Sequence, residues 1–138
     1  MNDAISGGRI VRRLPSELIP NISDAVEVTG NLVFFSGQVG IGSDGSVSSD
    51  FEAECDAAFG ALAGAMTRAG CEVKDLVRVT IYVTELPTRS LETIRAVRDR
   101  WIGTQSASTL VGVDALFRAG VNFEVDAIAV AASTRGLR

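Results

Sequence analysis

One segment near the C-terminal end, residues 121–130, constrains the fold of this chain more than any other. Its apolar and its polar or mixed positions alternate with a period of two, which is typical of a β-strand with one buried face. Glu124 and Asp126 fall on the same side of that predicted strand. The apolar residues of the opposite side are Phe123, Val125, Ala127 and Ala129. The segment therefore predicts a strand that carries two carboxylates on one face.

The chain contains no histidine, which limits its chemistry at once. A Ser-His-Asp or Cys-His nucleophile is excluded, so acid–base chemistry must rest on carboxylates, water and backbone groups. The two cysteines, Cys55 and Cys71, are too few for a disulfide framework and without histidine give no convincing zinc site. We expect Cys55 to be a small core residue and Cys71 to be partly exposed, both as reduced thiols.

Length and charge define the broad class of protein. With 138 residues and 46% hydrophobic residues, the chain is predicted to form a single globular domain that spans residues 1–138. The net charge of −4 disfavours a nucleic-acid partner, because phosphate contacts need a basic surface. The apolar runs are too short for a membrane span, and residues 1–6 lack the pattern of a secretory signal. These observations predict a cytoplasmic protein without a membrane partner.

Periodicity along the chain predicts an order of β-rich region, helix, strand, helix, strand and strand. The first helix is expected to begin after Ser49 as N-cap, with Glu52 completing a capping box, and to stop at Gly70. Residues 9–20 are expected to be extended or irregular, and residues 31–38 to form a buried strand. The remaining predicted elements are strands at 77–83, 108–113 and 121–130, and an amphipathic helix at 91–102.

Several segments and residues that could belong to functional motifs are interpreted as loop, core or surface residues without a functional role. Residues 40–45 match G-x-G-x-x-G, but no helix opens within the match, so a plain loop is expected. Trp101 is interpreted as a core residue rather than a ligand platform. The arginines of the second helix region are expected to form a mostly solvated face. These are Arg89, Arg95, Arg98 and Arg100.

Three segments in a fixed order resemble one known family. Residues 30–38 (Gly-Asn-Leu-Val-Phe-Phe-Ser-Gly-Gln), 76–83 and 123–130 are similar to the RidA/YjgF family of reactive-intermediate deaminases, once described as L-PSP endoribonucleases. The resemblance runs from about Gly30 to Val130, whereas residues 1–25 match poorly. It implies a chorismate-mutase-like α+β fold, in which a mixed sheet is backed by two helices and the protein is a homotrimer.

The resemblance also implies an activity. Members of the family bind small carboxylic acids in clefts between subunits, and active members hydrolyse enamines and imines to keto acids and ammonia without a metal or organic cofactor. The family glutamate that positions water or relays protons matches Glu124. The serine and glycine of its Ser-Gly-Gln motif match Ser36 and Gly37.

The arginine that holds the substrate carboxylate in the family does not match this sequence. Its position is occupied by Ser108, and a serine hydroxyl offers one neutral hydrogen bond in place of a charged fork. Arg95, which matches a cleft-facing asparagine of the family, is the expected source of a replacement positive charge. Arg12 and Arg13 are the alternatives, if the N-terminal segment folds across the cleft.

Two functional classes remain open from the sequence. The first is a divergent imine or enamine deaminase, or a related hydrolase, that acts on a small carboxylic acid or imine. The second is a non-catalytic trimer that binds a metabolite or a partner protein in the same cleft. Ribonuclease activity is disfavoured by the acidic charge balance and by the absence of histidine.

Overall fold

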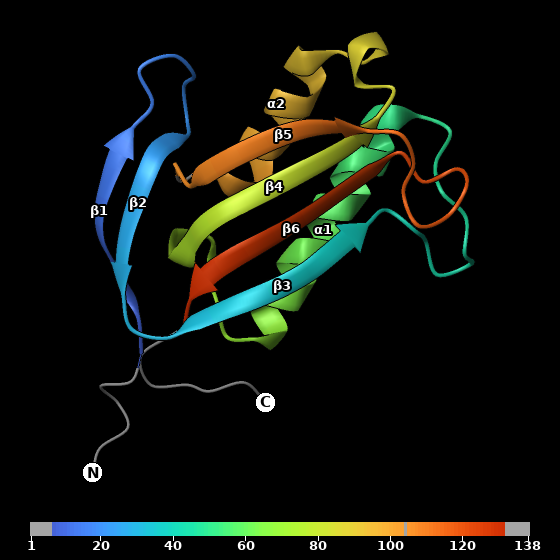
Figure 1. Ribbon diagram of the computed structural model, residues 1–138. Helices are drawn as coiled ribbons and strands as arrows, with labels where there is room; N and C mark the ends of the chain where they lie inside the picture. Colours follow the sequence, from blue (N-terminus) through green and yellow to red (C-terminus); the bar gives the residue numbers. More distant parts are fainter. Residues whose placement is uncertain (1–6, 104, 132–138) are drawn as a thin grey trace.

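The computed structural model describes residues 7–103 and 105–131. The expected absence of a secretory signal concerns residues 1–6, which lie outside this range. The described chain forms a mixed sheet of six strands in the order β1-β2-β5-β4-β6-β3, with helices α1 and α2 on one face (Figure 1). The predicted α+β fold is thereby confirmed. The elements are β1 (Arg9–Pro15), β2 (Ser23–Thr29), β3 (Leu32–Val39), α1 (Phe51–Arg68), η2 (Val73–Asp75), β4 (Leu76–Thr84), η3 (Leu86–Thr88), α2 (Leu91–Ile102), β5 (Ala107–Val113) and β6 (Phe123–Val130).

The core lies between the helices and the central strands. β6 pairs with β4 and β3 in antiparallel fashion, and β4 pairs with β5 in parallel. The alternation predicted for residues 121–130 is confirmed, because Phe123, Val125, Ala127 and Ala129 of β6 are buried on the face that carries the helices. Glu124 and Asp126 therefore lie on the opposite face of the sheet, which no helix of the described chain covers.

The first helix forms where the apolar pattern predicts it, but its N-cap differs from the prediction. The cap is Asp50 rather than Ser49, and the Asp50 side chain accepts a hydrogen bond from the Ala53 backbone N–H. The helix begins one residue later than the predicted capping box allows. Gly70, in the left-handed region with a φ of 77°, follows the end of the helix as expected.

The arginines near the second helix do not form one solvated face. Arg98 is buried, with 7% of its surface exposed, and it pairs with Asp99 at 2.8 Å. Arg89 is largely covered and stacks over the Phe51 ring at 4.3 Å. Arg95 and Arg100 are exposed, as expected for such a face.

The N-terminal segment is more regular than predicted. β1 and β2 form an antiparallel hairpin, and β2 joins the rest of the sheet through a single bridge between Ser23 and Ala107. The hairpin stands apart from the other four strands of the sheet (Figure 1). The sequence did not reveal this hairpin because the exposed and the partly buried residues of β1 do not alternate with a period of two.

Three smaller expectations are corrected or confirmed. β3 is an edge strand rather than a buried one, and Phe34 is 71% exposed on its open face. Cys71 is buried rather than partly exposed, whereas Cys55 is a core residue as predicted. Residues 40–45 form a loop that includes a turn, as expected. Within the described residues, neither helix has the length and apolarity needed to cross a bilayer.

Candidate functional site

Three polar side chains meet on the open face of the sheet. Glu124 and Asp126 project from β6, and Tyr82 on the neighbouring strand β4 is paired with Glu124 in the strand register. The Tyr82 hydroxyl donates a hydrogen bond of 2.8 Å to Asp126 Oδ2. This bond holds Asp126 in place. Glu124 is the other carboxylate of the pair, and Tyr82 does not bond to it.

The edge strand β3 approaches Glu124 through a β-bulge. Phe35 pairs with Ala127 and Gln38 pairs with Val125, so Ser36 and Gly37 together oppose the single residue Asp126. A Cβ atom at Gly37 would lie 2.6 Å from Glu124 Cδ and would overlap the carboxylate. The Glu124 side chain therefore lies directly against the Gly37 backbone, in space that only a glycine leaves free.

The surroundings of Glu124 favour its protonated form. Partial burial raises the pKa of the Glu124 carboxyl above its ordinary value, and the negative charge of Asp126 raises it further. Among residues 7–103 and 105–131, no side chain or backbone group forms a hydrogen bond or ion pair with this carboxylate. The hydrogen bond to Asp126 likewise raises the pKa of Tyr82. Glu124 is thus a half-buried carboxylate whose oxygens are available to water or a ligand.

Ser108 and Arg95 lie elsewhere, on the helix side of the sheet. Ser108 pairs with Val79, whose side chain is buried beneath the helices. A small cavity of about 70 Å³ separates β5 from α2 and is lined by Ser108, Arg95 and Arg98. Its remaining walls are aliphatic: Ile19, Ile22, Ile81, Ile94 and Leu110. Arg98 forms an ion pair with Asp99, whereas Arg95 has no hydrogen-bond or ion-pair partner among the described residues.

The alternative arginines have other contacts. Arg12 forms an exposed ion pair with Glu27 at 3.1 Å. Arg13 donates hydrogen bonds to the backbone oxygens of Gln105 and Lys74. Neither arginine lines the cavity that holds Ser108.

The predicted site residues therefore divide into two groups within one chain. On the open face Glu124 lies against Gly37, next to which Ser36 completes the bulge, while Ser108 and Arg95 line one cavity on the helix side. The sheet separates the two groups, so a ligand cannot contact both in a single copy of the described chain.

The sequence profile of the family described as Endoribonuclease L-PSP matches residues 16–131, most of the chain. The chain belongs to the Endoribonuclease L-PSP family. RutC family protein YjgH of Escherichia coli is 33% identical over 101 residues, which cover 73% of this chain and 76% of that protein. The predicted RidA/YjgF kinship is confirmed at the level of the family.

Solved structures of other L-PSP family members share the fold. YyfB from Yersinia pestis, described as a protein of unknown function of the Rid family, superposes with a TM-score of 0.72 at 25% identity. The match covers 89% of this chain and 98% of YyfB. The YjgF gene product of E. coli gives a TM-score of 0.64 at 26% identity, covering 87% of this chain and 98% of YjgF.

Sequence reasoning assigned no functional role to three polar residues of this L-PSP family member, two of them beside Glu124 and the third on the helix side of the sheet. Tyr82 and Asp126 were visible as polar positions on the open faces of adjacent strands, but only the strand register brings them together. Glu54 carried a clearer signal, because this acid lies within the apolar face of α1 beside Cys55 and Ala58. The described residues contain no group of three or more His, Cys, Asp or Glu side chains that could hold a metal ion.

Proposed function

We propose that this L-PSP family member is a cofactor-free hydrolase that converts a small imine or enamine to a carbonyl compound and ammonia. The observation that carries this proposal is the half-buried Glu124 carboxylate, which lies against Gly37 with a raised pKa and without a partner among the described residues. A carboxyl group whose pKa is moved toward the working pH suits both the acceptance and the return of a proton.

The chemistry follows from these properties. In its ionised form, Glu124 takes a proton from a water molecule while the water oxygen forms a bond to the carbon of a protonated imine. The resulting carboxylic acid returns that proton to the nitrogen. The carbon–nitrogen bond then breaks, ammonia leaves, and loss of the hydroxyl proton yields the carbonyl group. An enamine enters the same sequence after protonation at carbon gives the imine.

The proposed site lies between two copies of the chain in a homotrimer. This arrangement is supported by the division of the site, since Glu124 lies on the open face of the sheet and Ser108 and Arg95 lie on the helix side. A second copy can place its Ser108 and Arg95 opposite the Glu124 of the first. In this arrangement Arg95 supplies the positive charge for a substrate carboxylate, in place of the family arginine whose position Ser108 occupies.

A non-catalytic trimer that binds a metabolite or a partner protein is the second candidate. The observation that favours it is the cavity around Ser108, whose walls are mostly aliphatic. Losing a charge-assisted clamp on a carboxylate costs on the order of 2–5 kcal/mol of binding free energy. Such a loss weakens substrate orientation even where Glu124 remains able to move protons.

The test is release of keto acid and ammonia from imines generated enzymatically from a range of amino acids. The parent protein is expected to accelerate this release, and Glu124→Gln is expected to slow it by about 100-fold or more, because the amide cannot accept the proton. Glu92→Gln, at an exposed position of α2, is the matched control. Unchanged turnover in Glu124→Gln would remove Glu124 from the mechanism. Calorimetric binding of small acids without turnover of any imine would favour the second candidate.

A further inference from the structure

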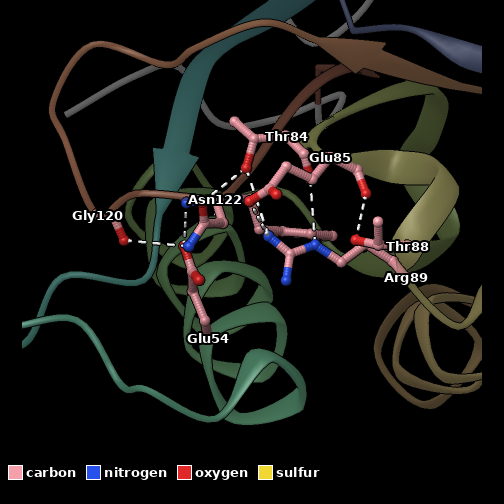
Figure 2. Close-up of polar contacts among 8 residues, drawn as sticks. Glu54, Thr84, Glu85, Thr88, Arg89, Gly120 and Asn122 are labelled. Atoms are coloured by element: carbon pink, nitrogen blue, oxygen red, sulfur yellow. Dashed lines mark hydrogen bonds and ion pairs between the residues drawn. The ribbon is translucent and has the colours of Figure 1, made fainter.

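Glu54 is the one acidic side chain among the described residues that is buried, with 1% of its surface exposed. It lies on the first turn of α1 and points toward the start of β6 (Figure 2). Its Oε2 atom accepts hydrogen bonds from the backbone N–H groups of Asn122 at 2.7 Å and Phe123 at 3.1 Å. Burial of a carboxylate is costly unless hydrogen bonds compensate it, so this arrangement requires both donors.

These two bonds fix the strand residue that precedes Glu124. The Phe123 ring is fully buried against α1, with its centroid 5.6 Å from the ring of Phe59 and 6.1 Å from that of Phe51. Phe123 is thus held to the helix both by its backbone N–H and by its side chain. Because side chains alternate along a strand, this attachment directs Glu124 to the opposite face.

The same turn of α1 also fixes the end of β3. A Cβ atom at Gly40 would lie 2.5 Å from the Glu54 backbone oxygen, so the chain just after β3 packs directly on the helix at Glu54. β3 carries Gly37, against which the Glu124 carboxylate lies. Glu54 is therefore a residue of α1 that contacts both the chain just after β3 and the start of β6, the two strands that build the Gly37–Glu124 contact.

The polar contacts continue from β6 into β4. The Thr84 hydroxyl donates to Asn122 Oδ1 at 2.6 Å, and Arg89 Nε donates to the Thr84 backbone oxygen at 3.1 Å (Figure 2). Arg89 in turn stacks over the Phe51 ring of α1. The start of β6 is thus held from the helix by Glu54 and from the neighbouring strand by Thr84.

We propose that Glu54 is a positioning residue, which sets the start of β6 against α1 and thereby holds the Glu124 carboxylate against Gly37. This inference rests on the proposed role of Glu124. Glu54 does not touch the ligand, because its carboxylate lies on the helix side of the sheet and is occupied by two backbone donors. Its effect is on the place and the surroundings of Glu124.

The test compares Glu54→Asp with Glu54→Gln. Aspartate keeps the charge but is one methylene shorter, so it cannot reach both N–H groups without a shift of the strand. Glutamine keeps the reach and an accepting oxygen. Glu52→Asp is the matched control, because Glu52 lies on the same turn of α1 but is exposed, and its one ion pair among the described residues is with Arg100 at 3.8 Å.

Two readouts separate this inference from the proposed function. The pKa of Glu124, followed by carbon-13 NMR of labelled glutamate carboxyl groups, is expected to fall toward its ordinary value in Glu54→Asp and to stay raised in Glu54→Gln and Glu52→Asp. The turnover of imines in Glu54→Asp is expected to fall by about 10- to 100-fold, as for small misplacements of a catalytic group. The titration tests the inference even if the parent protein hydrolyses no imine.

Two results would overturn the positioning role. The first is a folded Glu54→Asp protein in which the pKa of Glu124 remains at the parent value. The second applies even if Glu54→Asp does not fold: a folded Glu54→Gln protein in which the pKa of Glu124 has fallen to its ordinary value. That outcome would mean that the position of the accepting oxygen is not what matters.

Discussion

Glu124 is held where its charged form is disfavoured. Partial burial and the nearby charge of Asp126 both raise its pKa, and no hydrogen bond from the described residues offsets them. Asp126 acts in this way because it lies two residues from Glu124, and alternation along the strand puts both carboxylates on one face. A site of this kind reduces folding stability in return for a reactive carboxyl group.

We therefore predict a pH-dependent difference in stability between the parent and Glu124→Gln. A carboxyl group with a raised pKa binds its proton more tightly in the folded state than in the unfolded state, where the pKa has its ordinary value of 4.5. The folded parent accordingly loses stability as pH rises from that value through the raised pKa. Glutamine does not titrate, so the variant should be the more stable protein at neutral pH.

The measurement is the free energy of unfolding of both proteins across the range from about pH 4 to about pH 8. The advantage of Glu124→Gln is expected to shrink toward the acidic end and to vanish below the ordinary pKa. A difference that stays constant with pH would show that Glu124 has no shifted pKa in the protein as it exists in solution.

Strands β3 and β6 meet at Gly37 and Glu124, and this contact depends on the β-bulge at Ser36 and Gly37. The bulge places backbone rather than a side chain opposite the carboxylate. Bulges are common beside active sites, where they redirect a strand locally.

Gly37→Ala is predicted to separate activity from stability. The new methyl group would meet the end of a flexible side chain, so Glu124 can turn away toward solvent and the loss of stability should be below about 1 kcal/mol. Imine turnover should nevertheless fall by about 10-fold or more, since the carboxylate leaves its position. Gly64→Ala on α1 is the control, because among the described side chains the nearest to its new Cβ would be the end of Arg68, at 3.8 Å. Full activity in Gly37→Ala would contradict the proposed place of Glu124.

The amphipathic elements could be predicted from the sequence because each of them packs one apolar face against the core. α1, α2, β4 and β6 all lie within one or two residues of their expected ranges. The β1–β2 hairpin could not be predicted in this way, since it pairs with the remaining sheet through a single bridge and most of its residues are exposed. At the candidate site, Glu124 and Gly37 were named from the family resemblance, whereas their contact depends on the register of β3 against β6.

Across the folded chain, the proposed catalytic and anchoring groups face opposite directions. The open face carries Glu124 and also the exposed Phe34, while the Arg95 cavity opens on the helix side. An exposed aromatic residue on an uncovered sheet face is consistent with a surface that another copy covers. The two groups can act on one ligand only if assembly brings them together.

Subunit mixing tests this arrangement directly. Glu124→Gln and Arg95→Ala are each predicted to form inactive trimers. In every trimer that contains both variants, one of the three interfaces joins an intact Glu124 to an intact Arg95, so a randomly exchanged equimolar mixture should regain about a quarter of the parent activity. Light scattering should report a trimer for each protein. A monomer at micromolar concentration, or mixtures that remain inactive, would contradict a site shared between subunits.

The burial of both cysteines has a practical consequence for such work. Cys55 has no exposed surface and its thiol has a pKa raised to about 12, while Cys71 is 5% exposed. Neither thiol forms the reactive thiolate readily at neutral pH. A cysteine introduced at the exposed Ser43 would therefore react alone with a maleimide dye. Fluorescence energy transfer between subunits labelled in this way can follow their exchange without removal of the native thiols.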